Sequence, residues 1–284
     1  MLVFALAVAD ILFWYRIVFV PPTYAGPVPS ANFLDVGQGD SELVIFQDGT
    51  KVMTDAGPDG SVLASLENVL GANDRYIDLA VITHPQSDHY GGFASILDHY
   101  RIGAFIYNGR SDDPGVKTWP ALLAKIKEDH IPLITLGKGD KILIGTNKID
   151  ILSPDANFAE SGELNDTGLV ERIETPQFTA LLTADTGFDV QDALVAAGVD
   201  LRADILKVAH HGSKFSTDDG FLKAVDPKVA VVEVGAKNTF GHPAPETLAR
   251  IAASTGAAVF RTDRNGTVRI WRDGNVLKVA TGKQ

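Results

Sequence analysis

The apolar positions of this chain fall into short runs separated by Gly, Pro, Asp and Asn, a pattern typical of strands joined by turns. The runs predict strands over 32–36, 42–47, 50–54, 77–83, 103–107, 132–136, 141–144, 147–152, 168–174, 178–184, 204–209, 229–234 and 257–261, with a hairpin over 267–280. Apolar residues at helical spacing predict helices over 61–71, from about 88, and over 119–129, 188–197, 217–224 and 245–254. Strands interspersed with helices in this way predict an α/β sandwich, two sheets with helices on their outer faces.

The first 21 residues are charged only at Asp10 and Arg16. Because about 20 apolar residues suffice for a helix to cross a bilayer, residues 1–21 predict a membrane anchor. The alternative is an amphipathic helix that lies on the domain. No Lys or Arg precedes this stretch, which disfavours a cleaved signal peptide. The proline-rich residues 22–31 predict an extended linker, and residues 32–281 are predicted to form one domain.

The charge of the chain is acidic overall but unevenly divided. The formal net charge is −11, which by itself disfavours nucleic acid as a partner. Residues 1–200 hold 12 basic and 28 acidic side chains, whereas residues 201–284 hold 13 basic and 8 acidic ones. An anionic substrate therefore stays compatible with the last third of the chain. The chain has no cysteine, which excludes a disulfide, a thiolate metal site and a cysteine nucleophile.

The densest group of candidate ligands follows the apolar run that ends at Thr83. His84 comes at the end of this predicted strand, and Asp88 and His89 follow within five residues. Imidazole and carboxylate together suit a divalent metal such as zinc or manganese. The alternative is structural: His84 ends a strand and Asp88 caps a helix.

Two further groups lie at predicted strand exits. Asp185 follows the predicted strand 178–184, and one carboxylate can bridge two metals that lie about 3.5 to 4 Å apart. Its alternative role is a helix N-cap. His210 and His211 follow the predicted strand 204–209, and because neighbouring strand residues point to opposite faces, only one of them can face a shared site.

The ordered motifs of this chain resemble those of a known hydrolase family. Residues 84–89 are similar to the His-x-His-x-Asp-His signature of metallo-β-lactamase-fold hydrolases, although Gln86 stands where the family has His or Asp. Five more stretches resemble one branch, the extracytoplasmic domain of ComEC-type competence DNA-uptake proteins: 33–40 (Phe-Leu-Asp-Val-Gly-Gln-Gly-Asp), 54–57 (Thr-Asp-Ala-Gly), 182–185 (Leu-Thr-Ala-Asp), 207–213 (Lys-Val-Ala-His-His-Gly-Ser) and 238–243 (Asn-Thr-Phe-Gly-His-Pro).

The resemblance implies a four-layer αββα sandwich that holds one or two divalent metal ions, Zn or Mn. The ligands it implies are His84, Asp88, His89, Asp185 and His210. Gln86 makes the second ion doubtful, because an amide is a weak ligand. Asp55 is expected to support a ligand without binding the metal itself. Asp88 and His242 are the expected catalytic residues, and contacts to substrate are expected from Asp35, Asp40, Asn165, His211, Ser213, Lys214 and Asn238.

The function implied is metal-dependent hydrolysis, in which a metal-bound water attacks a phosphodiester of DNA. The same resemblance implies a bacterial, membrane-anchored domain that faces outside the cytoplasm and works with a separate uptake channel. Arg16 alone would instead place the domain in the cytoplasm. Two other functions stay open: a small-ester or lactone hydrolase, and a non-catalytic DNA-binding or assembly module with a degenerate metal site.

Overall fold

A computed structural model describes residues 28–110 and 117–283 of the chain. The anchor predicted over 1–21 and most of the linker predicted over 22–31 lie outside the described residues. Within the described ranges, no helix is both long and apolar enough to span a membrane.

The first sheet has eight strands and mixes both directions. β3 to β6 run parallel to one another, and the remaining neighbours pair antiparallel. In spatial order the strands are β15 (Val276–Thr281), β14 (Val268–Asp273), β1 (Ser30–Phe33), β2 (Glu42–Ile45), β3 (Lys51–Thr54), β4 (Tyr76–Ile82), β5 (Arg101–Tyr107) and β6 (Leu133–Thr135).

The second sheet has seven strands, of which β10 to β13 are parallel. Their spatial order is β13 (Ala258–Arg261), β12 (Val229–Val232), β11 (Ile205–Lys207), β10 (Thr179–Leu182), β9 (Val170–Glu174), β8 (Asn147–Ser153) and β7 (Lys141–Ile144). Each sheet thus contains four parallel strands, whose carboxyl ends can gather functional loops.

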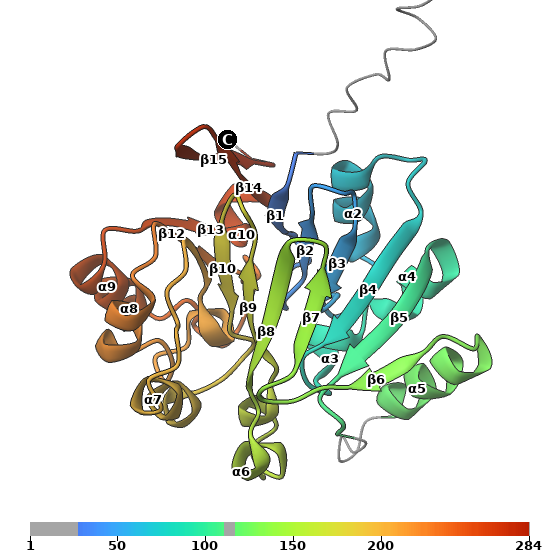
Figure 1. The fold of residues 1–284 in the computed structure, drawn as a ribbon, viewed down its shortest axis with the longest axis horizontal. Helices are drawn as coiled ribbons and strands as arrows, with labels where there is room; N and C mark the ends of the chain where they lie inside the picture. Colours follow the sequence, from blue (N-terminus) through green and yellow to red (C-terminus); the bar gives the residue numbers. More distant parts are fainter. Residues whose placement is uncertain (1–27, 111–116, 284) are drawn as a thin grey trace, which may run out of the picture.

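Helices cover the outer faces of both sheets, with α2, α4 and α5 on one side and α7, α8 and α9 on the other (Figure 1). The helices are α2 (Val62–Leu70), α3 (Ser87–Tyr90), α4 (Phe93–His99), α5 (Thr118–Glu128), α6 (Ala156–Ala159), α7 (Phe188–Ala196), α8 (Asp219–Val225), α9 (Pro245–Ser254) and α10 (Thr262–Asn265), with 3₁₀ turns η1 (Leu164–Thr167) and η2 (Ala209–Gly212).

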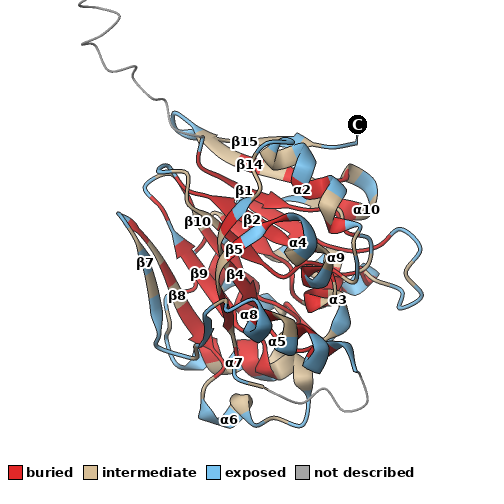
Figure 2. Ribbon diagram, turned by 90° about the vertical axis from the view of Figure 1, so that its right-hand side faces the viewer, coloured by how far each residue is buried: buried red, intermediate tan, exposed pale blue. Residues whose placement is uncertain are grey.

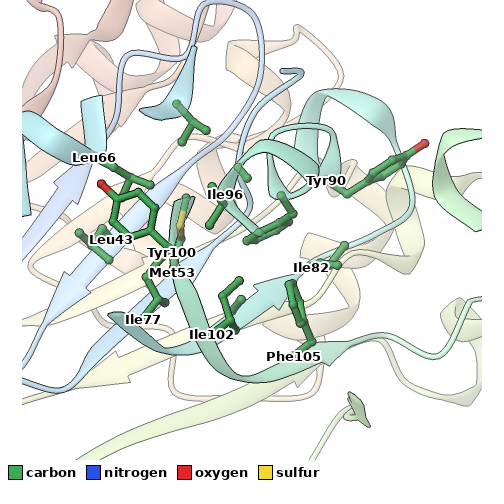
Figure 3. Close-up of a cluster of buried hydrophobic side chains, with 14 of the residues drawn as sticks. Leu43, Met53, Leu66, Ile77, Ile82, Tyr90, Ile96, Tyr100, Ile102 and Phe105 are labelled. Carbon is green, nitrogen blue, oxygen red and sulfur yellow. The ribbon is translucent and has the colours of Figure 1, made fainter. Parts of the chain in front are cut away.

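Three apolar clusters lie between these four layers. One includes Phe33, Val81 and Ile173 and fills the space between the two sheets. A second joins the eight-stranded sheet to its helices and contains Phe105 and Ile96 (Figure 3). The third packs α7, α8 and α9 on the other sheet. Buried residues accordingly form the inner strands in Figure 2. Two sheets between two helical layers confirm the predicted αββα sandwich.

Several predicted elements end earlier than expected, and two of them lie beside the predicted ligands. The strand predicted over 204–209 ends at Lys207, and a 3₁₀ turn follows it. The helix predicted from about residue 88 is broken into α3 and α4 at Gly91 and Gly92. A Cβ at these positions would come within 2.1 Å of the Pro58 carbonyl oxygen and 2.0 Å of the Ala56 carbonyl oxygen. Both glycines are therefore needed for close backbone packing beside the predicted ligands.

Candidate metal centre

The predicted ligands lie at the carboxyl ends of parallel strands in both sheets. His84, Asp88 and His89 follow β4 of the eight-stranded sheet, whereas Asp185 follows β10 of the seven-stranded sheet and His210, with His211 beside it, follows β11. Each of these strands pairs with a parallel neighbour. The site is therefore built between the two sheets at one end of the sandwich.

Four side chains converge closely enough to share one ion: Asp88, His89, Asp185 and His211, whose ligand atoms all lie within 4.8 Å of one another. Asp185 Oδ2 is 3.4 Å from Nε2 of His89 and 3.4 Å from Nε2 of His211. Asp88 Oδ2 is 3.4 Å from His211 Nε2. Bonds of about 2.0 to 2.1 Å to a tetrahedral ion put ligand atoms about 3.3 to 3.4 Å apart, so these spacings fit such an ion.

Each imidazole of this cluster points its Nε2 at the carboxylates. His89 Nε2 and His211 Nε2 are buried and have no hydrogen-bond partner among the described residues. Buried polar atoms normally have a partner, because leaving one unsatisfied costs about 1 to 3 kcal/mol. Both nitrogens face the Asp185 carboxylate, and a cation between them would pair with all three groups.

Asp55 holds His89 from behind. His89 Nδ1 is 2.6 Å from Asp55 Oδ2, and the same carboxylate accepts hydrogen bonds from the backbone N–H and the hydroxyl of Thr83. A carboxylate on Nδ1 fixes the orientation and tautomer of the ring, and so leaves Nε2 to face the ion. Asp55 therefore lies where a supporting residue is expected.

An unusual turn places His211 in the cluster. His210, His211 and Gly212 all have positive φ, at 51°, 53° and 80°. His211 Nδ1 donates to the Glu233 carbonyl oxygen at 2.9 Å, which directs Nε2 towards Asp185. His210 is more exposed, and its Nε2 is 3.9 Å from Asp185 Oδ2. Because β11 ends at Lys207, the alternation of a strand does not apply here, and the geometry favours His211 over His210 as a ligand.

His84 lies beside the four-residue cluster but does not belong to it. Its ring centroid is 4.1 Å from that of His89, and its Nε2 is buried without a hydrogen-bond partner in the described ranges. Burial lowers its pKa to about 4, with the nearby His89 adding to the effect, so the ring is neutral at neutral pH. Gln86, which would be the next ligand, is only partly buried at the start of α3.

A buried lysine that the sequence analysis did not single out lies beside the centre. Lys207 is fully buried, donates to the Ala184 carbonyl oxygen at 2.7 Å, and contacts the carboxylates of Asp40 and Asp185. Burial opposes its charge, but Asp40 and Asp185 outweigh burial and raise the pKa of Lys207. The lysine is therefore charged and compensates part of the negative charge near the centre.

The carboxylates of the cluster are charged for the same reason. Burial raises the pKa of Asp185, but His211, His89 and Lys207 outweigh it and hold the pKa well below its usual value. Burial likewise opposes ionisation of Asp88, and its contact with His211 lowers the pKa to about 2. Both groups are anions at neutral pH, which is the form that binds a cation.

Some of the other predicted site residues lie at the edge of the four-residue cluster, and others lie away from it. Asn165 Nδ2 is 3.5 Å from the ring nitrogens of His210, and the His242 ring is 5.6 Å from that of His210. Asp40 touches Lys207 and lies 3.2 Å from His211 Nδ1. Asp35 is not brought to the cluster, because its carboxylate pairs with Lys283 at 2.7 Å.

The remaining three, Ser213, Lys214 and Asn238, belong to two loops at the rim. Ser213 is buried and its hydroxyl accepts a hydrogen bond from Phe215 N, whereas Lys214 is exposed. The Asn238 side chain donates to the carbonyl oxygens of Gly235 and His242. The Asn238 side chain thus stabilises the conformation of the loop to which it belongs.

The structural alternatives for the aspartates do not fit. The N-cap of α7 is Gly187, so Asp185 does not cap that helix. The N-cap of α3 is Gln86, and Asp88 lies within its first turn. Neither carboxylate is therefore explained by capping.

Comparison with known proteins agrees with this geometry. Residues 34–235 match the family model described as the metallo-beta-lactamase superfamily. ComE operon protein 3 of Bacillus subtilis is 28% identical over 259 residues, 84% of this chain and 32% of that protein. Competence protein ComA of Neisseria gonorrhoeae is 28% identical over 246 residues, 83% of this chain and 31% of that protein. The chain thus spans about a third of the length of these curated relatives.

Solved structures share the fold at low sequence identity. The metallo-beta-lactamase fold protein YhfI of Bacillus subtilis superposes with a TM-score of 0.56 at 14% identity, over 82% of this chain and 96% of that one. CmlA, a diiron beta-hydroxylase from Streptomyces venezuelae, gives 0.53 at 13% identity, over 87% of this chain and 55% of that one. Likeness at this identity shows the fold alone.

Proposed function

Because the chain belongs to the metallo-β-lactamase superfamily of metal-dependent hydrolases, we propose that it hydrolyses phosphodiester bonds of DNA at the centre formed by Asp88, His89, Asp185 and His211. The observation that carries the proposal is the convergence of these four groups within 4.8 Å, with three pairs of ligand atoms 3.4 Å apart and two buried imidazole nitrogens among them. Relatives named for competence and for recombination support DNA as the substrate.

The exposure of the four side chains indicates a different role for Asp88 than for the other three. A divalent cation held by the four residues supplies a Lewis acid that acidifies water and polarises a phosphoryl oxygen. Asp88 has 31% of its side chain exposed, whereas the other three carboxylate and imidazole groups are almost fully buried, so Asp88 faces the side from which substrate arrives. Asp88 accepts a hydrogen bond from the attacking water, since its pKa of about 2 keeps it an anion.

The two rim histidines serve as neutral hydrogen-bonding groups. Burial lowers the pKa values of His210 and His242 below the usual value of a histidine, so at neutral pH each ring has one N–H and one lone pair. His242 Nδ1 has no hydrogen-bond partner among the described residues. We assign His242 to the leaving oxygen, to which its N–H donates.

The chain is proposed to hold one ion tightly. The four-residue set is complete, whereas a second ion would depend on His84 and on an amide at Gln86. An amide oxygen is a weaker ligand than an imidazole or a carboxylate for zinc or manganese. A second ion is therefore bound weakly at best.

The direct test is metal quantification of the purified chain together with cleavage assays in manganese, magnesium and zinc. We expect about one ion per chain and cleavage of DNA and of bis(p-nitrophenyl) phosphate. Asp185→Ala should lower the metal content far more than His242→Ala, because Asp185 is a proposed ligand of the ion and His242 is not. Turnover of lactones or small esters without phosphodiester cleavage would instead establish the ester hydrolase. A chain without tight metal would leave a non-catalytic module.

We further propose that residues 1–21 tether this domain to a membrane, facing away from the cytoplasm, where it meets DNA beside a separate uptake channel. The support is the apolar composition of that stretch and the competence-related relatives. Protease added to intact cells should release a fragment that begins near residues 22–31. Protection until the cells are permeabilised, or recovery in the soluble cytosolic fraction, would contradict the tether.

A further inference from the structure

Two exposed phenylalanines stand at the rim of the metal centre. Phe215 is 64% exposed and Phe240 is 69% exposed, which makes them the most exposed aromatic side chains among the described residues. Phe215 lies in the 213–217 loop that follows His211, and Phe240 lies in the 235–242 loop that contains His242. The residues that flank the two loops are joined, because Ala244 N donates to the Gly212 carbonyl oxygen at 2.8 Å.

A chain of ring contacts connects Phe240 to the centre. The Phe240 ring lies over the His242 ring with centroids 6.0 Å apart and planes inclined by 20°. His242 in turn contacts His210, whose Nε2 is 3.9 Å from Asp185 Oδ2. A flat apolar ring is thus presented to solvent two ring contacts away from His210, outside the groups proposed to hold the ion.

Both loops are fixed in place by hydrogen bonds. The Asn238 side chain donates to the carbonyl oxygens of Gly235 and His242 and accepts from the backbone N–H groups of Phe240 and His242. Arg250 donates to the carbonyl oxygens of Lys214, Ser216 and Thr217. The backbone that carries the two exposed rings is therefore fixed, so a ligand need not order the loops on binding.

The two loops themselves carry positive charge only. The two loops contain the exposed Lys214 and Lys237 and no acidic residue, in a chain whose net charge is −11. Lys214 Nζ lies 5.0 Å from the centroid of the Phe215 ring. Aromatic faces beside cations are the combination that binds single-stranded nucleic acid, since bases stack on the rings and phosphates pair with the lysines.

From this arrangement, and resting on the proposed function, we infer that Phe240 and Phe215, with Lys214 and Lys237, form a base-stacking site that selects single-stranded DNA. In a duplex the faces of the bases are already stacked on one another, so only an unpaired base can lie on Phe240. Phe240 is 69% exposed, so the face of its ring that points away from His242 is open to such a base.

The test is binding of fluorescein-labelled (dT)12 to the full chain by fluorescence anisotropy, in EDTA so that the strand is bound but not cut. Phe240→Ala should weaken binding on the order of tenfold, the loss expected for one stacked base. Phe240→Trp should retain it. An abasic strand of equal length should bind wild type and Phe240→Ala alike, because it has phosphates but no bases. Leu143→Ala is the matched control, since it removes a residue that is 74% exposed on β7.

Two results would overturn the inference: equal affinity of wild type and Phe240→Ala for (dT)12, or equal affinity of the wild type for single-stranded and duplex DNA. A loss in Phe240→Ala that is the same for the abasic strand would also overturn it. The proposed function fails separately, if the metal-loaded wild type does not cleave bis(p-nitrophenyl) phosphate, because that substrate tests the metal centre and the anisotropy assay contains no metal.

Discussion

His210 and His211 are adjacent in sequence but lie in different surroundings. The backbone has left-handed conformation at both residues, which directs His211 into the buried carboxylates and leaves His210 at the rim. No pattern of apolar residues predicts a left-handed conformation at two successive histidines, since such residues adopt it rarely. The choice between the two therefore depended on tertiary contacts, above all the Glu233 carbonyl oxygen at His211 Nδ1.

The two histidines should be separable by metal content. We expect His211→Ala to lose most of the bound metal, as Asp185→Ala does, because it removes one of four ligands. His210→Ala should retain the metal and lower the turnover of DNA. Metal quantification of both proteins after dialysis checks this, with the exposed His99→Ala as control. Retention of metal in His211→Ala, with loss in His210→Ala, would restore the assignment implied by the family resemblance.

Gln86 offers the opposite experiment, a gain. His84 Nε2 is buried and unpartnered within the described ranges, so an imidazole at position 86 would complete a second set of ligands. Gln86→His should raise the metal-to-protein ratio from about one towards two. Ser87→His adds the same group at the exposed neighbouring position and should leave the ratio unchanged. An unchanged ratio in Gln86→His would mean that His84 does not belong to a metal position.

At the scale of elements, most strands and helices could be predicted because the apolar pattern reports burial directly. β4, β10 and β12 are nearly continuous apolar runs, as expected for strands between two layers. The residues that follow them, among them Asp88, His89 and Asp185, could be located for the same reason. Lys207 could not, because its place in an apolar strand gives no sign of its partners Asp40 and Asp185, which lie far away in sequence.

β9 contains a buried carboxyl group that the apolar pattern of the chain does not reveal. Glu171 is fully buried and accepts a hydrogen bond from the Thr54 hydroxyl of β3, across the space between the two sheets. Burial raises the pKa of Glu171 to about 8, opposed by the Thr54 hydrogen bond and reinforced by the charge of Asp55. The carboxyl group is therefore mostly neutral in the folded protein at neutral pH.

This shift predicts the sign of a pH effect on stability. Between pH 4.5 and about 8 the unfolded chain has released the Glu171 proton and the folded chain retains it, so the free energy of unfolding falls as pH rises through this window. Glu171→Gln removes the titration. The free energy of unfolding of this variant, relative to that of the wild type, should therefore rise by roughly 3 to 4 kcal/mol between pH 5 and pH 9. Urea unfolding at both pH values measures the difference.

The control for this measurement lies on the same strand. Glu174 is exposed and pairs with Arg172 at 2.9 Å, and that contact lowers its pKa. Glu174→Gln should therefore give no gain in stability at pH 9. Equal pH dependence of unfolding in the wild type and in Glu171→Gln would show that Glu171 is charged in the folded protein.

At the scale of the whole molecule, the family match confirms the resemblance first drawn from the motifs, and the fold explains why those motifs are scattered. Asp88 and His89 follow a strand of one sheet, while Asp185 and His211 follow strands of the other. A cation bound by all four would join the two sheets and offset the repulsion between Asp88 and Asp185. Because the unfolded chain cannot bring these residues together, such an ion would bind the folded state preferentially.

Metal should therefore raise the thermal stability of the molecule, and not only its activity. A ligand at one hundred times its Kd adds about 2.7 kcal/mol, which for a chain of this size corresponds to a rise in Tm on the order of 5 to 10 °C. Chelation should reverse the rise. Asp185→Asn should unfold at the same temperature with and without metal, because it lacks the carboxylate that both imidazoles approach at 3.4 Å. Asp48→Asn, changed in the turn between β2 and β3, should respond as the wild type does. Calorimetry of the three proteins with saturating metal and with EDTA provides the measurement. If the wild type binds metal but its Tm does not change, the ion lies away from the junction of the two sheets.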